Sequence, residues 1–131
     1  MGGGSQDEPL YSVRDWNDGR AVTLQIHSKY LNYDVSDGLK ATLRDVVQVR
    51  LDQGVRQFVL DLAQVSIVDS CGVGLMIGVH NLVRDAAGTL YLTGITHFLQ
   101  KIFRMMHLDQ YFHVVGSVDE LERLLAATPT A

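Results

Sequence analysis

Cysteine, proline and long apolar runs are all scarce in this chain of 131 residues. Cys71 is the only cysteine, so no internal disulfide can form, and no Cys/His cluster has the spacing of metal ligands. A lone thiol favours a reducing compartment, and we expect a cytoplasmic protein. Apolar runs stay well short of the roughly 18–20 residues of a membrane-spanning helix, so we expect no membrane insertion. The N-terminus also lacks the basic-then-apolar pattern of a secretion signal.

Positive charge is also limited, because 11 Lys and Arg stand against 15 Asp and Glu and the net charge is −4. The basic residues are scattered without forming a stripe, which argues against nucleic-acid binding. Apolar residues make up 47% of the chain, as expected for a packed globule, and the length suits one domain. We assign this domain to residues 11–126, with a flexible N-terminal linker at 1–10 and a frayed C-terminus at 127–131.

Alternation and helical periodicity predict an α/β fold with the order β-β-α-β-α-β-α-β-α. We expect a mixed, mostly parallel sheet of about five strands, covered by about four helices. The expected strands are Tyr11–Trp16, Ala21–Ile26, Phe58–Leu62, Thr89–Thr93 and Tyr111–Val115. The first expected helix runs through Leu39–Leu51 and is capped by Asp34 or Ser36. The next two are Ser70–Ala86 and Thr96–Met106, and a final helix is capped by Ser117. The segment His27–Asn32 is expected to be a loop.

The stretch Phe58–Gly74 is the most informative part of the chain. A buried strand leads through a short connection to Asp69 and Ser70, which open a glycine-rich helix, and Ser70 stands where an N-cap belongs. A helix start offers unpaired N–H groups and a positive dipole end. A phosphate on Ser70 would therefore be expected in a favourable field, and it would add about 1.5–2 negative charges.

Three enzyme interpretations of this stretch fail. The glycines of Gly72–Gly74 lack the third member of a dinucleotide-binding motif, because Ile77 stands there. A serine-hydrolase elbow needs a glycine where this chain has Val68. Asp61 lacks the second aspartate of a phosphatase motif, since Ala63 follows two residues later, and we expect Asp61 to cap a turn. We therefore expect no catalytic residue, no cofactor and no metal, and no enzymatic activity.

Small residues at the start of the same helix leave two alternatives open. Cys71 is either a small apolar filler or a redox-active thiol. Gly72, Gly74 and Gly78 weaken the helix by about 1 kcal/mol for each interior position, so they indicate a close approach of this helix to the sheet or to a partner.

The segments Val59–Leu62 and Val68–Leu75 resemble the signature of bacterial anti-sigma factor antagonists. These proteins carry the STAS domain, which is also found at the end of sulfate transporters. Three later segments, Gly88–Gly94, Phe98–Phe103 and His107–Phe112, are similar to later elements of the family, so the likeness covers about residues 11 to 126. In the family, the serine directly after the aspartate is phosphorylated by a partner serine kinase, which is often the anti-sigma factor.

The resemblance implies that Ser70 is the phosphorylation site of a partner-switching pathway that regulates transcription. The unphosphorylated chain would bind a serine kinase or anti-sigma factor, phosphorylation would release it, and a separate serine phosphatase would restore the first state. The alternative is a STAS adaptor or regulatory subunit, for example of a transporter, whose Ser70 is not phosphorylated.

The resemblance also implies a partner-binding surface around the phosphorylation site. Asp69 would hold the loop, and Gly72 would let the partner come close. Family members often carry Gly-Glu-Leu-Asp after the second strand, whereas this chain has Lys29–Asn32, which lacks the acidic residues and favours a different partner. The residues expected to contact the partner are Asp69, Ser70, Cys71, Gly72, Val73, Met76, Tyr30 and Asn32.

Overall fold

A five-stranded mixed sheet forms the centre of the structure, a computed structural model that describes residues 9–127. The first two strands form an antiparallel hairpin, and the remaining neighbours pair in parallel. This confirms the expected mixed, mostly parallel sheet. In spatial order the strands are β1 (Tyr11–Trp16), β2 (Ala21–Ile26), β4 (Gln57–Asp61), β6 (Thr89–Thr93) and β7 (His113–Val114).

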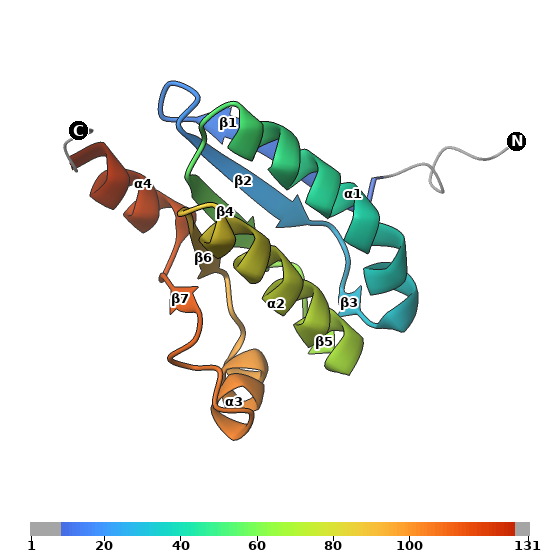
Figure 1. Ribbon diagram of the computed structural model, residues 1–131. Helices are drawn as coiled ribbons and strands as arrows, with labels where there is room; N and C mark the ends of the chain where they lie inside the picture. The colour runs from blue at the N-terminus through green and yellow to red at the C-terminus, as the bar shows by residue number, and fades with distance from the viewer. Residues whose placement is uncertain (1–8, 128–131) are drawn as a thin grey trace, which may run out of the picture.

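Two long helices, α1 (Tyr33–Asp52) and α2 (Ser70–Asp85), lie side by side across the sheet (Figure 1). α3 (His97–Met105) lies beyond the end of the sheet, and α4 (Val118–Ala127) follows β7. α4 is tied to β1 by an ion pair between Arg14 and Glu122 at 3.1 Å. Four helices were expected, and the described residues contain these four.

The core lies between the sheet and the pair α1 and α2. Alternate residues of β2 and β4 enter it, because successive side chains of a strand point to opposite faces. The expected stripe of α1 is also confirmed, since Leu39, Leu43, Val47 and Leu51 are buried. Each fully buried aliphatic side chain contributes about 1.5–3 kcal/mol relative to an exposed one, so this layer fixes how the two helices lie.

Two elements were missed in the sequence and one was expected to be longer. β3 (Tyr30–Leu31) and β5 (Ile67–Val68) form a separate two-stranded parallel sheet, where we expected a loop and a plain connection. The last strand is confined to His113–Val114 because the chain still turns at Phe112, whose N–H donates to the Leu108 carbonyl at 3.3 Å. The predicted linker at 1–10 and frayed end at 127–131 fall almost wholly outside the described residues.

The helix caps also differ from expectation at two places. α1 begins after Asn32, whose side-chain oxygen accepts from the Val35 N–H at 3.2 Å, so neither Asp34 nor Ser36 is its cap. α2 is capped by Asp69, and Ser70 is its first residue. At the end of α1 the expected stop is confirmed, because Gly54 follows with a φ of 94°, in the region that favours glycine.

Candidate functional site

The short β3–β5 sheet joins two segments that lie 37 residues apart in the sequence. Tyr30 pairs with Ile67, and Leu31 pairs with Val68. The Lys29 carbonyl accepts hydrogen bonds from the N–H groups of Ser66 at 2.8 Å and Ile67 at 3.0 Å. The segment Lys29–Asn32 therefore lies directly beside the segment that leads to Ser70, and the two present one continuous surface.

Asp69 ties the starts of both long helices together. Its Oδ1 accepts from the N–H groups of Cys71 at 2.9 Å and Gly72 at 3.1 Å, which caps α2. Its Oδ2 accepts from the N–H of Tyr33 at 3.0 Å, at the first residue of α1. One carboxylate thus satisfies three backbone donors that the helices cannot pair internally. The role expected for Asp69 in holding the loop matches this geometry.

Ser70 is exposed at the first position of α2, directly after the capping carboxylate. The N–H groups of Cys71 and Gly72 already donate to Asp69, and that of Val73 donates to the Asp69 carbonyl at 3.1 Å. A phosphate on Ser70 would find these donors occupied and a carboxylate beside it. The favourable field expected from the helix start is therefore reduced, and a phosphate there would extend outward into solvent or toward a partner.

Three residues of the expected contact surface lie inside the molecule instead. Val73 and Met76 are 3% and 0% exposed, because they are on the face of α2 that packs on the sheet. A Cβ on Gly72 would overlap the Leu31 carbonyl oxygen and lie 2.8 Å from a methyl group of Val68. This glycine makes room for β3 and β5 of its own chain, so neither it nor the two buried side chains can contact a partner directly.

The exposed face of the site is built from other residues. Tyr30 is 47% exposed, as a contact residue should be, while Asn32 is half-buried and engaged in capping α1. Two neighbours of Tyr30 were not anticipated: Ile67 is 45% exposed and Tyr33 is 61% exposed. An isoleucine in a connection between a strand and a helix is a signal that could have identified Ile67. We call Tyr30, Tyr33, Ile67 and Ser70 the switch surface.

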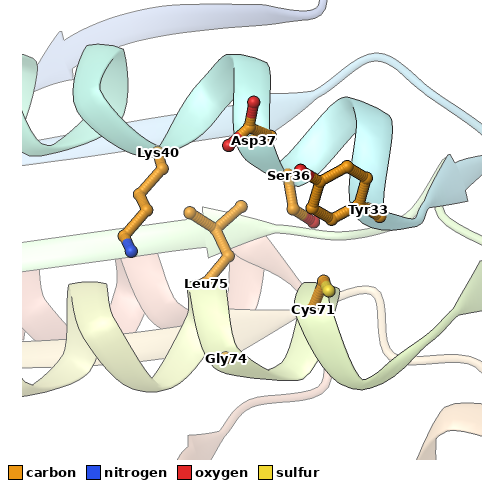
Figure 2. Close-up of a pocket in the computed structure, with 7 residues that line it drawn as sticks. All are labelled: Tyr33, Ser36, Asp37, Lys40, Cys71, Gly74 and Leu75. Atoms are coloured by element: carbon orange, nitrogen blue, oxygen red, sulfur yellow. The ribbon is translucent and has the colours of Figure 1, made fainter.

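A groove of about 280 Å³ runs between the first turns of α1 and α2, beside the switch surface (Figure 2). The Ser36 hydroxyl, which is buried without a partner among the described residues, and the exposed Cys71 thiol both lie between the two helices. Because Cys71 is exposed, it does not act as an apolar filler. Lys40 extends toward α2 and adds a positive charge.

The glycines farther along α2 differ from Gly72. A Cβ on Gly74 or Gly78 would meet nothing within 4 Å, so neither glycine is needed for contact with the sheet. Both are exposed, and together with Cys71 they leave a strip of α2 without bulky side chains. A partner could approach the helix backbone closely along this strip.

Asp61 has the expected structural role, because its Oδ1 accepts from the Ala63 N–H at 3.0 Å and closes a turn. Within residues 9–127, no three His, Cys, Asp or Glu side chains are grouped so that they could hold a metal ion. No helix in the same range is long and apolar enough to cross a membrane.

Comparison with known proteins gives one family. The STAS domain model matches residues 19–121. Bacillus SpoIIAA in its phosphorylated form is 18% identical, with 87% of this chain and 98% of that chain covered and a TM-score of 0.62. A STAS domain protein from Planctomyces limnophilus is 12% identical, with 89% and 98% covered and a TM-score of 0.75. A sulfate transporter family protein from Wolinella succinogenes is 18% identical, with 87% and 98% covered and a TM-score of 0.68. Because the family model matches most of this chain, the chain belongs to the STAS domain family.

Proposed function

We propose that this chain is a phospho-switched anti-sigma factor antagonist that acts by binding, without catalysis of its own. The observation that carries the proposal is Ser70, exposed at the start of α2 and flanked by the capping carboxylate of Asp69. SpoIIAA, an anti-sigma factor antagonist of the same fold, has been solved in unphosphorylated and phosphorylated forms. The partner in our proposal is a serine kinase or anti-sigma factor, and a separate serine phosphatase resets the switch.

The unphosphorylated chain binds its partner through the switch surface. Tyr30, Tyr33 and Ile67 supply exposed apolar area, and the strip of small residues at Cys71, Gly74 and Gly78 allows close contact with α2. Lys29, whose Nζ lies 5.9 Å from the centre of the Tyr30 ring, stands where family members often have acidic residues. The partner surface that complements it would therefore carry a negative charge.

Phosphorylation of Ser70 would oppose this contact electrostatically. The phosphate adds about 1.5–2 negative charges beside the Asp69 carboxylate, and the nearest helix-start donors already serve that carboxylate. Burying such a group against a partner without new donors would cost about 3 kcal/mol, which is roughly a hundredfold in affinity. The switch would thus work through added charge alone, without a change of fold.

Mapping phosphate on the chain tests the proposal. The purified protein is incubated with ATP and magnesium, with and without a candidate partner serine kinase, and its peptides are then sequenced by mass spectrometry. We expect one phosphate, on Ser70 only, and only when the kinase is present. Phosphate on Ser66 with Ser70 unmodified would contradict the site, and self-labelling that survives repurification would contradict the absence of catalysis.

Binding measurements on two variants separate the effect of a negative charge at position 70 from the effect of losing the Ser70 hydroxyl. We expect Ser70→Ala to bind the partner constitutively and Ser70→Asp to bind it weakly, measured by surface plasmon resonance. Ser66→Asp is the matched control, because Ser66 is exposed three residues before Asp69 and brings the same charge to the preceding turn. Equal losses of affinity in the two Asp variants would show that general repulsion, rather than the Ser70 position, controls binding.

A second candidate is a STAS adaptor or regulatory subunit whose Ser70 is never phosphorylated. It is favoured by the likeness to the Wolinella sulfate transporter family protein and by the Lys-Tyr-Leu-Asn sequence of residues 29–32. Mass spectrometry of the chain isolated from its native cells discriminates the two. Co-purification with transport subunits and an unmodified Ser70 under all growth conditions would favour the adaptor.

A further inference from the structure

A second hollow, of about 310 Å³, lies at the opposite end of α2 from the switch surface. A helix of 16 residues is about 24 Å long, so this hollow is far from Ser70. It opens between the last turn of α2, the start of β6 and the segment that leads into β7. Six polar side chains line it, namely His80, Arg84, Thr89, Gln110, Tyr111 and His113.

His80 is the most unusual of these residues. Its side chain is 7% exposed, and Nδ1 is fully buried without a hydrogen-bond partner among the described residues. The ring is held by aromatic neighbours, with its centroid 4.5 Å from that of Tyr111 and 5.5 Å from that of Phe112. A buried polar atom without a partner costs about 1–3 kcal/mol. His80 also lines the hollow, so a turn of its ring would let a group bound there supply that partner.

The hollow is positive, and no carboxylate lines it. Arg84 is permanently charged, and His113 brings a second imidazole. The nearest acid is Asp85, whose Oδ1 lies 3.5 Å from Nη2 of Arg84. Both members of that ion pair are largely exposed, so the pair is weak and leaves the guanidinium able to bind another anion.

We propose that this hollow binds a small oxyanion, the phosphate group of inorganic phosphate or of a small phosphate ester. Arg84 would donate charge-assisted hydrogen bonds to two of its oxygens, and His80 would donate from Nδ1 once its ring turns toward the hollow. Thr89 and Gln110 also line the hollow and offer further donors. The volume is at the lower end for ligand sites, which suits a small ligand. The site does not depend on the function proposed for Ser70.

Protonation of His80 should accompany binding. Burial, with help from the charges of Arg84 and His113, lowers the pKa of His80, so the free protein holds a neutral ring at pH 7. A bound anion would favour the charged imidazolium and raise that pKa. Binding therefore takes up a proton, and affinity should rise as the pH falls from 8 to 6. The other titratable or charged side chains that face the same hollow are Arg84, Tyr111 and His113.

Calorimetric titration of the full chain with sodium sulfate and sodium phosphate, at constant ionic strength in chloride, tests the site. Sulfate does not titrate in this range, so its pH dependence reports the protein alone. We expect saturable binding of one ion, weakened at least tenfold by Arg84→Gln. The matched control is Arg44→Gln, which removes the same charge from an exposed position on α1. Equal weakening by both variants would reduce the effect to net charge and overturn the proposal.

NMR on the unmutated protein gives an independent readout. Sulfate should shift the ring C–H resonances of His80 more than those of the exposed His97 or His107. Tighter binding of glucose 6-phosphate than of inorganic phosphate would identify an ester as the ligand class, and equal binding would identify free phosphate. The absence of both saturable heat and a selective His80 shift would show that the hollow holds no anion.

Discussion

The two ends of α2 carry side chains of opposite charge, and each complements the helix dipole. The dipole places partial positive charge at the first turn and partial negative charge at the last. In this chain the first turn carries the Asp69 carboxylate, which already occupies the N–H groups of Cys71 and Gly72. The last turn carries Arg84 and faces two histidines. Each end thus carries the side-chain charge that the dipole favours, negative at the first turn and positive at the last.

The difference teaches how one helix can serve two kinds of anion. At the first turn the N–H groups of Cys71, Gly72 and Val73 already donate to Asp69, so a covalently attached phosphate on Ser70 would act largely as unpaired charge. At the last turn a buried nitrogen of His80 has no partner, so a free anion would gain hydrogen bonds. A phosphate would repel a partner at the first end and be bound at the second.

Among substitutions in the first turn of α2, we expect Gly72→Ala to have the largest effect on stability. Its Cβ would overlap the Leu31 carbonyl and lie 2.8 Å from a Val68 methyl group, so the β3–β5 sheet would have to move. We expect the free energy of unfolding to fall by about 3 kcal/mol, measured by urea denaturation. Gly74→Ala is the matched control in open space, where a better helix former should add up to about 1 kcal/mol. Equal losses in both would contradict the close contact.

Asp69→Ala should have the next largest effect on stability. The variant loses acceptors for the N–H groups of Cys71, Gly72 and Tyr33, which join two helices. We expect a loss of about 1–2 kcal/mol in the same measurement. Ser70→Ala is the control, because Ser70 follows the cap, and it should change stability by less than about 0.5 kcal/mol. The reverse ranking would restore Ser70 as the cap.

Regular elements could be predicted from the sequence because they bury periodic apolar faces. Ala21–Ile26 and Thr89–Thr93 were expected with the bounds that the structure has, and so was the buried stripe of α1. β3 and β5 are two residues long each, too short for any periodic pattern, and they form through contacts between distant segments.

The sequence was enough to predict where the candidate site lies, but not which of its side chains are exposed. Asp69 and Ser70 are local signals at a helix start. Met76 was misplaced on the surface, because which face of α2 meets the sheet depends on packing, and a helix with many apolar residues leaves several choices. The hollow at His80 was not anticipated, since His80, Thr89 and His113 meet only through the order of the strands.

A smaller effect should appear at the other end of α2, as a pH dependence. Burial, assisted by Arg84 and His113, holds the pKa of His80 below its ordinary value of 6.5. The unfolded chain therefore takes up a proton at higher pH than the folded chain does, and stability is lost as the pH falls below about 6.5. One such group contributes at most about 1.4 kcal/mol per pH unit.

Urea denaturation of the unmutated protein and His80→Gln between pH 7.5 and 5.5 measures this slope. The other histidines are common to both chains, so the difference isolates His80. We expect the unmutated chain to lose stability more steeply toward acid. Sulfate should reduce that loss, because the anion stabilises the imidazolium. A steeper loss in His80→Gln would show that the folded protein favours the charged ring and would reverse the assignment.

The smallest effect on stability should come from Tyr30→Ala, although the variant should impair binding. Tyr30 is 47% exposed in a two-residue strand, and a substitution there should change the free energy of unfolding by less than about 0.5 kcal/mol. Its ring is a large apolar part of the switch surface, so affinity for the partner should fall about tenfold, or about 1.4 kcal/mol. Val49→Ala is the matched control: Val49 is 51% exposed in the last turn of α1, far from Ser70, and its loss should leave both stability and affinity unchanged. Unfolding of Tyr30→Ala in circular dichroism would make Tyr30 a structural residue. Full affinity in a folded variant would place the contact on another face and leave the groove beside Cys71 as the surface to test next.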